Sequence, residues 1–475
     1  MGSRKKNSVR LLSLIMALML LLSAGLPQIV QGQAKSEGNK SLYTSENSTQ
    51  SKISKDLTDT FKSEKNVTFL VKFNEQVNTK KVAEKSVNVA QKQQLSAAKT
   101  ELRKRSVIVS SLRANALDTQ HNVKAYLQKQ KKAGNVTSFQ SFYIVNAMAV
   151  SGTEEVAKEL AKFGEIEKIL PNRTRQLIKG DAIKKAKINA ADDNIEPNVA
   201  HIDAPQVWGM GIDGSGVVIA SLDSGVQWDH PALKDKYRGY DPENPNQPNH
   251  EFNWFDAVNG EAVPYDDIGH GTHTVGTMVG SEADGSNQIR VAPGAEWIAV
   301  KVFSAVGGTD ADLLAAGEWI LAPKDAEGNP HPEMAPDIVN NSWGGGRGLD
   351  EWYRPMVQAW RDAGIFPAFA AGNTTDTEPG GPGSIAAPSN YPDSFAVGAV
   401  NNDNELADFS LQGPSPYDEI KPDVVAPGVG VRSAIPGSGY GGKSGTSMAT
   451  PLVSGTVALL LQANSSLSVT KWKML

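Results

Sequence analysis

The sequence predicts an α/β fold with a mostly parallel sheet and helices on both faces, preceded by a small α+β domain. From about residue 200 onward, apolar β-branched runs alternate with stretches of helical periodicity, which is typical of a covered parallel sheet. In residues 61–180, strand-like and helix-like stretches alternate in a much smaller block, which favours an α+β sandwich. The 475 residues suffice for two or three domains, and the 40% hydrophobic content supports a core. With no cysteine, stability must come from that core and from any bound ions.

Charge is distributed unevenly, although the net charge is only -5. Residues 35–190 contain 29 Lys and Arg against 15 Asp and Glu, whereas residues 191–475 contain 14 against 37. The basic residues are scattered and lack interleaved aromatics, so we expect no nucleic-acid partner. We expect instead that the basic block docks on the acidic one, because complementary fields speed and orient docking.

The N-terminus has the features of a secretory signal peptide over residues 1–34, which predicts a secreted, extracellular protein. Basic residues precede an apolar run from Leu11 to Leu26, and Gly32-Gln33-Ala34 offers small residues for cleavage. The apolar run is about the shortest that could span a bilayer, so a membrane anchor is the alternative. Residues 35–60 are rich in Ser, Thr, Asn and Lys and are predicted to be disordered.

Residues 61–180 form the predicted α+β domain. Strands are expected at Val67–Phe73, Phe142–Val150 and Ile166–Leu177. Helices are expected within 78–132 and from Ser151 to Phe163. Pro171 places the last strand at a sheet edge, because proline cannot donate to a ladder.

A charged segment without apolar periodicity, residues 181–197, is predicted to be an exposed and cleavable linker. We expect cleavage between about Asn189 and Asn198. The domain that follows, residues 198–475, carries the predicted parallel sheet. Its strands are expected at Val217–Leu222, Trp297–Phe303, Asp337–Asn341, Ile365–Ala371 and Ser394–Val400, with helices at Leu313–Leu321 and Trp352–Ala363.

Three motifs supply the residue types of an acyl-transfer site. Ser447 follows a glycine-rich loop and precedes an apolar helical run, and a helix N-terminus favours a developing oxyanion. Taken alone, that segment could equally be a helix cap. Asp223 ends an apolar run at the carboxyl end of a predicted strand, and His270 opens a second helix of small residues.

Asp223, His270 and Ser447 occur in the chain order of the subtilisin-type triad, and the chain resembles the subtilisin-like serine proteases (subtilases, peptidase S8 type). The resemblance runs from about Asn198 to the C-terminus, with a weaker match upstream to the subtilase propeptide. It implies that Ser447 is the nucleophile, His270 the general base and Asp223 the residue that orients the imidazole. It also implies that Asn373 contributes its amide to the oxyanion hole.

The resemblance further implies where substrate binds. Ser342-Trp343-Gly344 is similar to the segment that pairs with extended substrate, and Ala371 and Gly372 would line the first specificity pocket with it. Neither strip contains a charged residue, so we expect broad specificity with an apolar preference. Trp343 is bulkier than the residue usual in the family and either narrows a subsite or serves packing.

No cofactor is expected to be required for the chemistry. His270 and His273 are three residues apart, but Gly271 stands where a zincin motif has glutamate, so His273 is predicted to be structural. A structural calcium ion is the alternative that the family suggests. Its candidate ligands are Glu282 and Asp284 in an oxygen-rich turn, and Asp266 and Asp267 are ambiguous in the same way.

The sequence thus predicts a secreted serine endopeptidase, made as a self-processing zymogen, that acts on proteins or peptides as a monomer. Its own propeptide is the expected chaperone and inhibitor. Two departures from the family leave another hypothesis open: only 28 residues follow Ser447, and Leu452 stands where the family usually has histidine. That second hypothesis is a truncated, inactive remnant that acts as a binding or inhibitory module.

Overall fold

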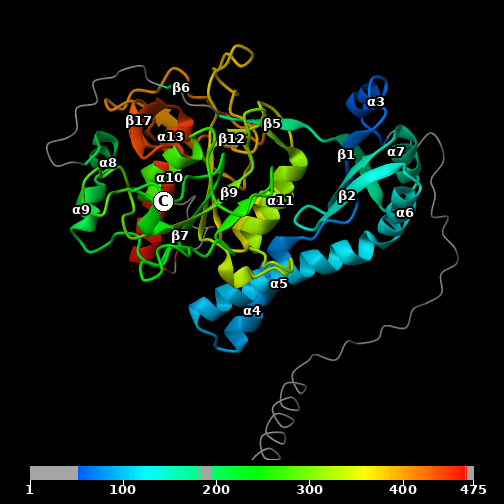
Figure 1. The fold of residues 1–475 in the computed structure, drawn as a ribbon, viewed down its shortest axis with the longest axis horizontal. Coiled ribbons are helices and arrows are strands. Elements are labelled where there is room, and N and C mark those ends of the chain that lie inside the picture. Colours follow the sequence, from blue (N-terminus) through cyan, green and yellow to red (C-terminus); the bar gives the residue numbers. More distant parts are fainter. Residues whose placement is uncertain (1–51, 179–180, 183–194, 466, 468–475) are drawn as a thin grey trace, which may run out of the picture. The chain divides into compact units, whose positions relative to one another are not determined.

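The computed structural model describes residues 52–178, 181–182, 195–465 and 467. A four-stranded antiparallel sheet with its helices comes first, and a larger part built on a seven-stranded sheet follows (Figure 1). The predicted signal peptide and the first part of the segment predicted to be disordered lie outside the described residues.

The smaller part is an α+β domain whose sheet has the strand order β2-β3-β1-β4. β1 (Val67–Phe73) pairs antiparallel with β3 (Ala147–Gly152) and with β4 (Ile166–Pro171). β2 (Val136–Phe142) pairs with the other side of β3, so that the single strand predicted across this stretch is a hairpin. β4 lies at the edge, as its proline predicts.

Helices cover this sheet and extend from it. The stretch predicted to be helical divides into α4 (Thr79–Lys92), α5 (Ala97–Thr119) and α6 (His121–Lys132). Ser96 begins α5 by accepting a hydrogen bond from a backbone N–H of its first turn. α7 (Glu154–Leu160) is shorter than the helix predicted there.

The prediction of disorder for residues 35–60 is wrong for their described part. α3 (Lys55–Phe61) is a helix whose N-cap, Ser54, accepts from the backbone N–H of Leu57. Leu57 is fully buried in the core of the small domain. A buried leucine, a capping serine and backbone hydrogen bonds to Ile169 of β4 hold a segment whose composition is otherwise polar.

The larger part confirms the predicted mostly parallel sheet with helices on both faces. Its strand order is β15-β14-β13-β11-β7-β9-β8, and all of its strand pairs are parallel. The strands are β7 (Val218–Asp223), β8 (Trp254–Asp256), β9 (Glu296–Lys301), β11 (Ile338–Asn341), β13 (Phe366–Ala370), β14 (Phe395–Val400) and β15 (Val424–Pro427). The chain order reverses at β7, between β11 and β9, and such a point is where open α/β sheets place their sites.

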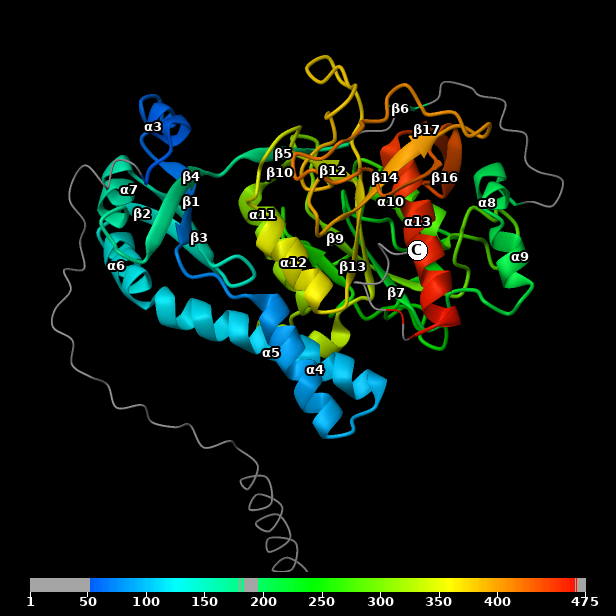
Figure 2. The ribbon, with the colours of Figure 1, turned by 180° about the vertical axis from the view of Figure 1, so that it is seen from behind.

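Alternate residues of β7 belong to two different cores, one on each face of the sheet. Ala220 and Leu222 join the core that holds α11 (Asp310–Leu321) and α12 (Arg354–Asp362). Ile219 joins the core on the other face. The helices of that second core include α10 (Gly271–Val279) and α13 (Thr446–Ala463), and Figure 2 shows α12 and α13 from behind.

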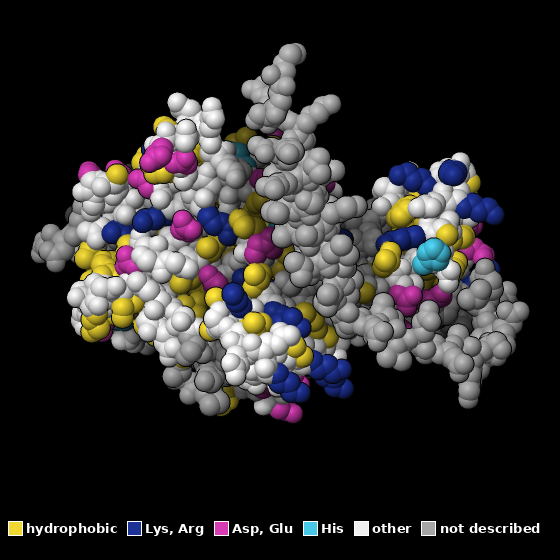
Figure 3. All heavy atoms as spheres, turned by 90° about the horizontal axis from the view of Figure 1, so that it is seen from below, with side chains coloured by type: hydrophobic (Ala, Val, Ile, Leu, Met, Phe, Trp, Pro, Cys, Tyr) yellow, Lys and Arg dark blue, Asp and Glu magenta, His cyan; other side chains and the backbone are white. Residues whose placement is uncertain are grey.

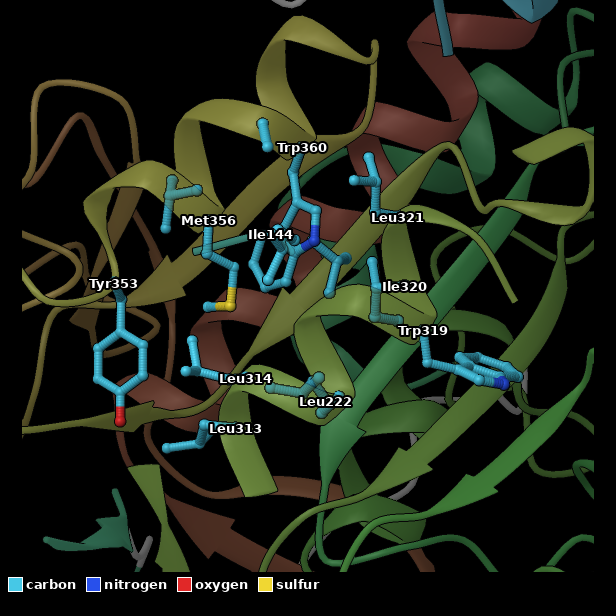
Figure 4. Packing of buried hydrophobic residues seen from close by; sticks show 14 of the residues in the cluster. Ile144, Leu222, Leu313, Leu314, Trp319, Ile320, Leu321, Tyr353, Met356 and Trp360 are labelled. Atoms are coloured by element: carbon cyan, nitrogen blue, oxygen red, sulfur yellow. The ribbon is translucent and has the colours of Figure 1, made fainter. Parts of the chain in front are cut away.

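Side chains of α11 and α12 interlock closely on the first face (Figure 4). Met356 and Trp360 of α12 pack over Gly317 of α11, where a Cβ atom would lie 2.2 Å from the Met356 sulfur. Trp360 also donates its indole N–H to the Gly317 carbonyl at 3.0 Å. Ile144, from the turn between β2 and β3, is buried in the same core, so the small domain contributes to the packing of the larger one.

Of the helices that the structure describes, α13 is the one long and apolar enough to cross a membrane. Its apolar window is 67% buried inside the fold, as expected for the core helix of a sheet.

Hydrogen bonds and ion pairs join the small domain to the larger one. Arg105 of α5 donates to the carbonyl oxygens of Ala335 and Ala363 at 3.1 Å each, and pairs with Asp337 at 3.3 Å. This basic-to-acidic pairing has the direction expected from the charge distribution. Figure 3 shows the Lys and Arg side chains of one face in several separate groups, without a continuous basic stripe.

Glu318 of α11 receives the turn of the small domain. One carboxylate oxygen accepts the backbone N–H groups of Tyr143 and Ile144, and the other accepts from Lys324 at 3.2 Å. The carboxylate is fully buried, and burial is the largest effect on its pKa, which is raised above the ordinary value of 4.5 although Lys324 and the two N–H groups lower it in part. An ionised Glu318 is therefore a cost to the folded chain.

We predict that Glu318→Gln changes the pH dependence of stability. A raised pKa means that the folded state holds the proton more tightly than the unfolded state. The contribution of this carboxyl to stability is therefore complete below pH 4.5 and is lost as the pH rises through the folded-state pKa. The variant lacks this loss, so its unfolding free energy minus that of the parent should rise with pH, by about 1.4 kcal/mol per unit of pKa shift.

Denaturant titrations between about pH 4 and 8 measure this difference. Both chains should carry Ser447→Ala to prevent self-digestion. Glu296→Gln, which changes an exposed carboxylate, is the matched control. A difference that stays constant with pH would contradict the prediction.

Candidate active site

The structure brings Asp223 and His270 together at the carboxyl end of β7. Asp223 is the last residue of the strand, and its Oδ1 lies 2.8 Å from Nδ1 of His270, which precedes α10. Ser224 donates its backbone N–H to the same oxygen at 2.7 Å, and the side chains of Asp223 and His270 are both buried. Because Nδ1 donates to the carboxylate, the neutral imidazole keeps Nε2 as an acceptor.

That acceptor is buried and has no hydrogen-bond partner among the described residues. Leaving a buried polar atom without a hydrogen bond costs free energy, so an unpaired Nε2 at this position needs an explanation. Ser447, the second residue of α13, instead donates its hydroxyl to the carbonyl oxygen of Ile178 at 2.5 Å. The predicted hydrogen bond from Ser447 to His270 is therefore not formed in this arrangement.

Ile178 belongs to a segment of the small domain that lies along the larger one as an added strand. β5 (Thr174–Leu177) pairs antiparallel with β12 (Trp343–Gly344) on one side and with β10 (Gly308–Thr309) on the other (Figures 1 and 2). The backbone N–H of Ile178 donates to the carbonyl of Ser342 at 3.1 Å. The long strand predicted at Ile166–Leu177 is therefore two strands in two different sheets.

The chain is also held beyond Ile178. Residues Asp181–Ala182 form β6, which pairs antiparallel with β17 (Gly439–Ser444) just before the helix of Ser447. The predicted linker at residues 181–197 is thus partly paired, and at its far end Ile195 forms a bridge with Gln288. Residues 183–194 lie outside the described part of the chain. The carbonyl of Ile178 is consequently presented to Ser447 by backbone pairing on both sides.

Asn373 follows β13 and lies beside the start of α13. Its side-chain oxygen accepts the backbone N–H and the hydroxyl of Thr446 at 3.0 and 2.8 Å. Because Thr446 holds the side-chain oxygen of Asn373, the NH₂ group of this amide points away from Thr446. Sequence reasoning selected Asn373 but missed Thr446, which fixes its orientation.

The predicted substrate-binding residues differ in their contacts. Gly344 faces Ile178, whose Cδ1 lies 3.5 Å from the position a Cβ would take on that glycine. Trp343 is fully buried against Phe369 and other rings, which supports its packing role. Ala371 is fully buried, and the Cβ position of Gly372 is filled by Leu411 and Ala386. The first-pocket role of these last two residues stays a prediction.

Asp266, left ambiguous by the sequence, organises the loop of His270. Its two oxygens accept from Ser224 Oγ, from the backbone N–H groups of Ile268 and Gly269, and from the N–H and hydroxyl of Thr272, at 2.7 to 3.1 Å. Asp267 pairs at 2.6 Å with Lys301, whose side chain is fully buried under the loop. These contacts give each carboxylate a partner within the protein.

His273 is structural in its contacts, as expected. Its Nε2 lies 3.1 Å from the carbonyl oxygens of Val431 and Gly441, which identifies it as the protonated nitrogen. Complete burial, together with the nearby Lys443 and His270, lowers its pKa to about 3. The ring is therefore neutral at neutral pH.

The candidate calcium ligands lie in the turn after α10. Glu282 accepts from Tyr440 at 2.6 Å and from Asn287 at 2.9 Å, and Asp284 accepts a backbone N–H within the turn. Among the described residues, no group of three or more His, Cys, Asp or Glu side chains is arranged to hold a metal ion. Calcium on this turn is untested.

Comparison with known proteins agrees with this geometry. The family model described as "Subtilase family" (Peptidase_S8) matches residues 214–475, and the chain belongs to this family of serine proteases. It is 58% identical to Bacillopeptidase F of Bacillus subtilis (strain 168) over 98% of its own length and 33% of that relative. It is 35% identical to Serine protease AprX of the same organism, over 55% of this chain and 60% of that relative.

It is also 32% identical to Subtilisin E of Bacillus subtilis (strain 168), over 70% of this chain and 74% of that relative. The chain thus spans about a third of the length of Bacillopeptidase F and most of the length of Subtilisin E.

We predict that Asp266→Ala lowers kcat by roughly 10- to 100-fold, because five donors lose their acceptor and the loop that positions His270 loosens. Asp266→Asn, which keeps one acceptor oxygen, should recover part of the loss. Rates should be expressed per titrated active site, so that misfolded protein does not count. Asp229→Ala, at an exposed carboxylate that accepts from Gln227, is the control. An unchanged kcat in Asp266→Ala would show that the loop keeps its conformation without the Asp266 carboxylate.

Proposed function

We propose that this protein is a secreted serine endopeptidase made as a self-inhibited zymogen, and that its first substrate is its own Ile178–Lys179 bond. One observation carries the proposal: a strand of the small domain is paired into the larger one and presents the Ile178 carbonyl to the Ser447 hydroxyl. Extended pairing of this kind is how proteases commonly hold peptide substrates.

The proposed reaction begins when the Ser447 hydroxyl turns from the Ile178 oxygen towards Nε2 of His270, the buried acceptor without a described partner. Ser447 Oγ attacks the carbonyl carbon of Ile178 while its proton passes to Nε2. Asp223, hydrogen-bonded to Nδ1, stabilises the imidazolium that forms. A serine hydroxyl is a weak nucleophile without such a base.

The charge that develops on the Ile178 oxygen needs donors. The Asn373 amide, turned by Thr446, and the backbone N–H of Ser447 at the start of α13 are the proposed oxyanion donors. The C–N bond to Lys179 then breaks, and the imidazolium gives its proton to the leaving amine. Water, deprotonated by His270, hydrolyses the ester and restores the Ser447 hydroxyl. No metal or other cofactor takes part in these proposed steps.

The small domain is the proposed inhibitor and chaperone of the larger one. In this proposal its strand β5 occupies the substrate position. Arg105 and Thr79 bind Ala335 and Asp362 of the larger domain, and Ile144 enters the core that the two domains share. Hydrophobic burial and backbone pairing at several separated points would template the larger domain and outlast the first cleavage. The predicted signal peptide supports secretion, and protein or peptide substrates follow from the family.

This geometry moves the expected first cleavage upstream. The sequence alone favoured a bond between about Asn189 and Asn198, and most of that stretch lies outside the described residues. The carbonyl that lies at Ser447 is that of Ile178. Cleavage after Ile178 would free the new N-terminus at Lys179, and later trimming within the linker would then produce a shorter chain.

We predict that the purified chain cleaves an unfolded protein substrate and that Ser447→Ala abolishes the activity. A fluorophosphonate probe should label the parent chain at Ser447 and leave the variant unlabelled, because the probe reports an activated serine. Ser454→Ala, which changes a buried serine further along α13, is the matched control and should still be labelled. Absence of both cleavage and labelling in the parent would favour the inactive-remnant hypothesis.

We predict that the earliest new N-terminus of the refolding chain is Lys179. Intact-mass measurements over time, with N-terminal sequencing of the first product, identify the bond. The rate constant should not depend on protein concentration, since the strand is already in place within one molecule. The Ser447→Ala chain should remain whole. A first cut between residues 189 and 198, or a rate that rises with concentration, would refute the assignment of the first bond.

A further inference from the structure

We infer that the enzyme selects arginine at the fourth residue before the cleaved bond, through an acidic pocket made by Asp310, Asp350 and Tyr353. The inference rests on the proposed function, which makes Ile178 the residue before the bond and therefore Arg175 the fourth. Arg175 belongs to the bound strand of the small domain, whereas all residues of the pocket belong to the larger domain. The pocket would thus remain on the enzyme when the small domain leaves.

The guanidinium of Arg175 is held by two carboxylates at once. Its Nε donates to Asp310 at 2.6 Å, and its Nη2 donates to Asp350 at 3.0 Å. The side chains of Arg175 and Asp310 are 8% and 4% exposed, whereas that of Asp350 is 31% exposed. A charged group so deeply buried requires matched partners, and the pocket supplies them.

Two other features of the pocket fit a flat cation. The Tyr353 ring lies 5.5 Å from the Arg175 guanidinium carbon, within reach of a cation–π contact, and its hydroxyl donates to Asp310. Gly345 leaves room for the guanidinium, because a Cβ there would lie 2.5 Å from Nη1 of Arg175. The ring of Tyr353 is in turn supported by Trp343, whose centroid is 5.1 Å away.

The pocket is built on well-anchored elements. Asp310 is the first residue of α11, and the capping box between Thr309 and Asp312 fixes this helix end. β10, which ends at Thr309, also pairs with the bound strand, so the pocket and the strand are placed in register. A substrate that pairs as β5 does would put its fourth side chain at the same position.

This pocket corrects the expectation of broad, apolar specificity. The two strips used for that expectation contain no charge, but the acidic groups come from two other segments, at 310 and 350. At the residue before the bond, the contact of Ile178 with Gly344 keeps the apolar preference. The inferred substrates are therefore extended chains with arginine four residues before the bond and an apolar residue next to it.

The test starts from the whole chain and uses the enzyme that results once the small domain has been cleaved off and released. Its substrates are peptides that carry the sequence of residues 174–182. The position of Arg175 is varied among arginine, lysine, norleucine and glutamate. We expect kcat/KM for arginine to exceed that for norleucine on the order of 10- to 100-fold, because charge-assisted hydrogen bonds are lost. Lysine should lie between them, since an ammonium cannot bridge both carboxylates as a guanidinium does, and glutamate should be the poorest.

Asp310→Asn should bring the arginine-to-norleucine ratio close to one. Asp350→Asn, at the more exposed carboxylate, should reduce it and provides a second variant if the first fails to fold. Glu351→Gln is the control, because the Glu351 carboxylate pairs with Arg354. Equal kcat/KM for arginine and norleucine in the parent enzyme would overturn the inference while leaving the protease intact. Cleavage of none of the peptides, together with no probe labelling of Ser447, would refute the proposed function itself.

Discussion

Backbone pairing of the segment that ends at Ile178 is the interaction on which the rest of this structure depends. Main-chain hydrogen bonds to β10 and β12 fix its direction and register, and the alternation of a strand then decides which side chain meets which part of the enzyme. The carbonyl at Ser447, the isoleucine at Gly344 and the arginine at Asp310 all follow from one register. A shift of one residue would separate every one of these pairs.

The candidate catalytic residues are held by a different kind of contact. Asp223 and His270 lie at the carboxyl end of the sheet, where the loops are irregular. There the Asp266 carboxylate accepts hydrogen bonds from the loop that would otherwise be made within regular secondary structure. The fully buried Lys301 sits beneath, bound to Asp267 and to two carbonyl oxygens. Charged groups thus maintain the geometry in a region where backbone ladders end.

The order of the three motifs and the alternating pattern predicted the fold and the candidate catalytic residues, since both are local in sequence. The features that could not be predicted from the sequence are contacts between segments that lie far apart along the chain. In the sequence, Asp310 has the features of an ordinary first-turn helix residue, and its pairing with Arg175 appears only in the structure. The polar stretch around Leu57 has the composition of a disordered segment, and the burial of Leu57 likewise appears only in the structure. The hairpin between β2 and β3 was missed because its turn residues Tyr143 to Asn146 are themselves largely apolar.

The turn that carries Ile144 has one more consequence. Its side chain fills part of the core beside α11 and α12, while the N–H groups of the turn cover the Glu318 carboxylate. If the small domain leaves as proposed, the larger domain would expose an apolar hollow next to a carboxylate that water can then reach. The surface of the released larger domain would therefore keep the shape of the turn that had covered it, beside α11 and α12.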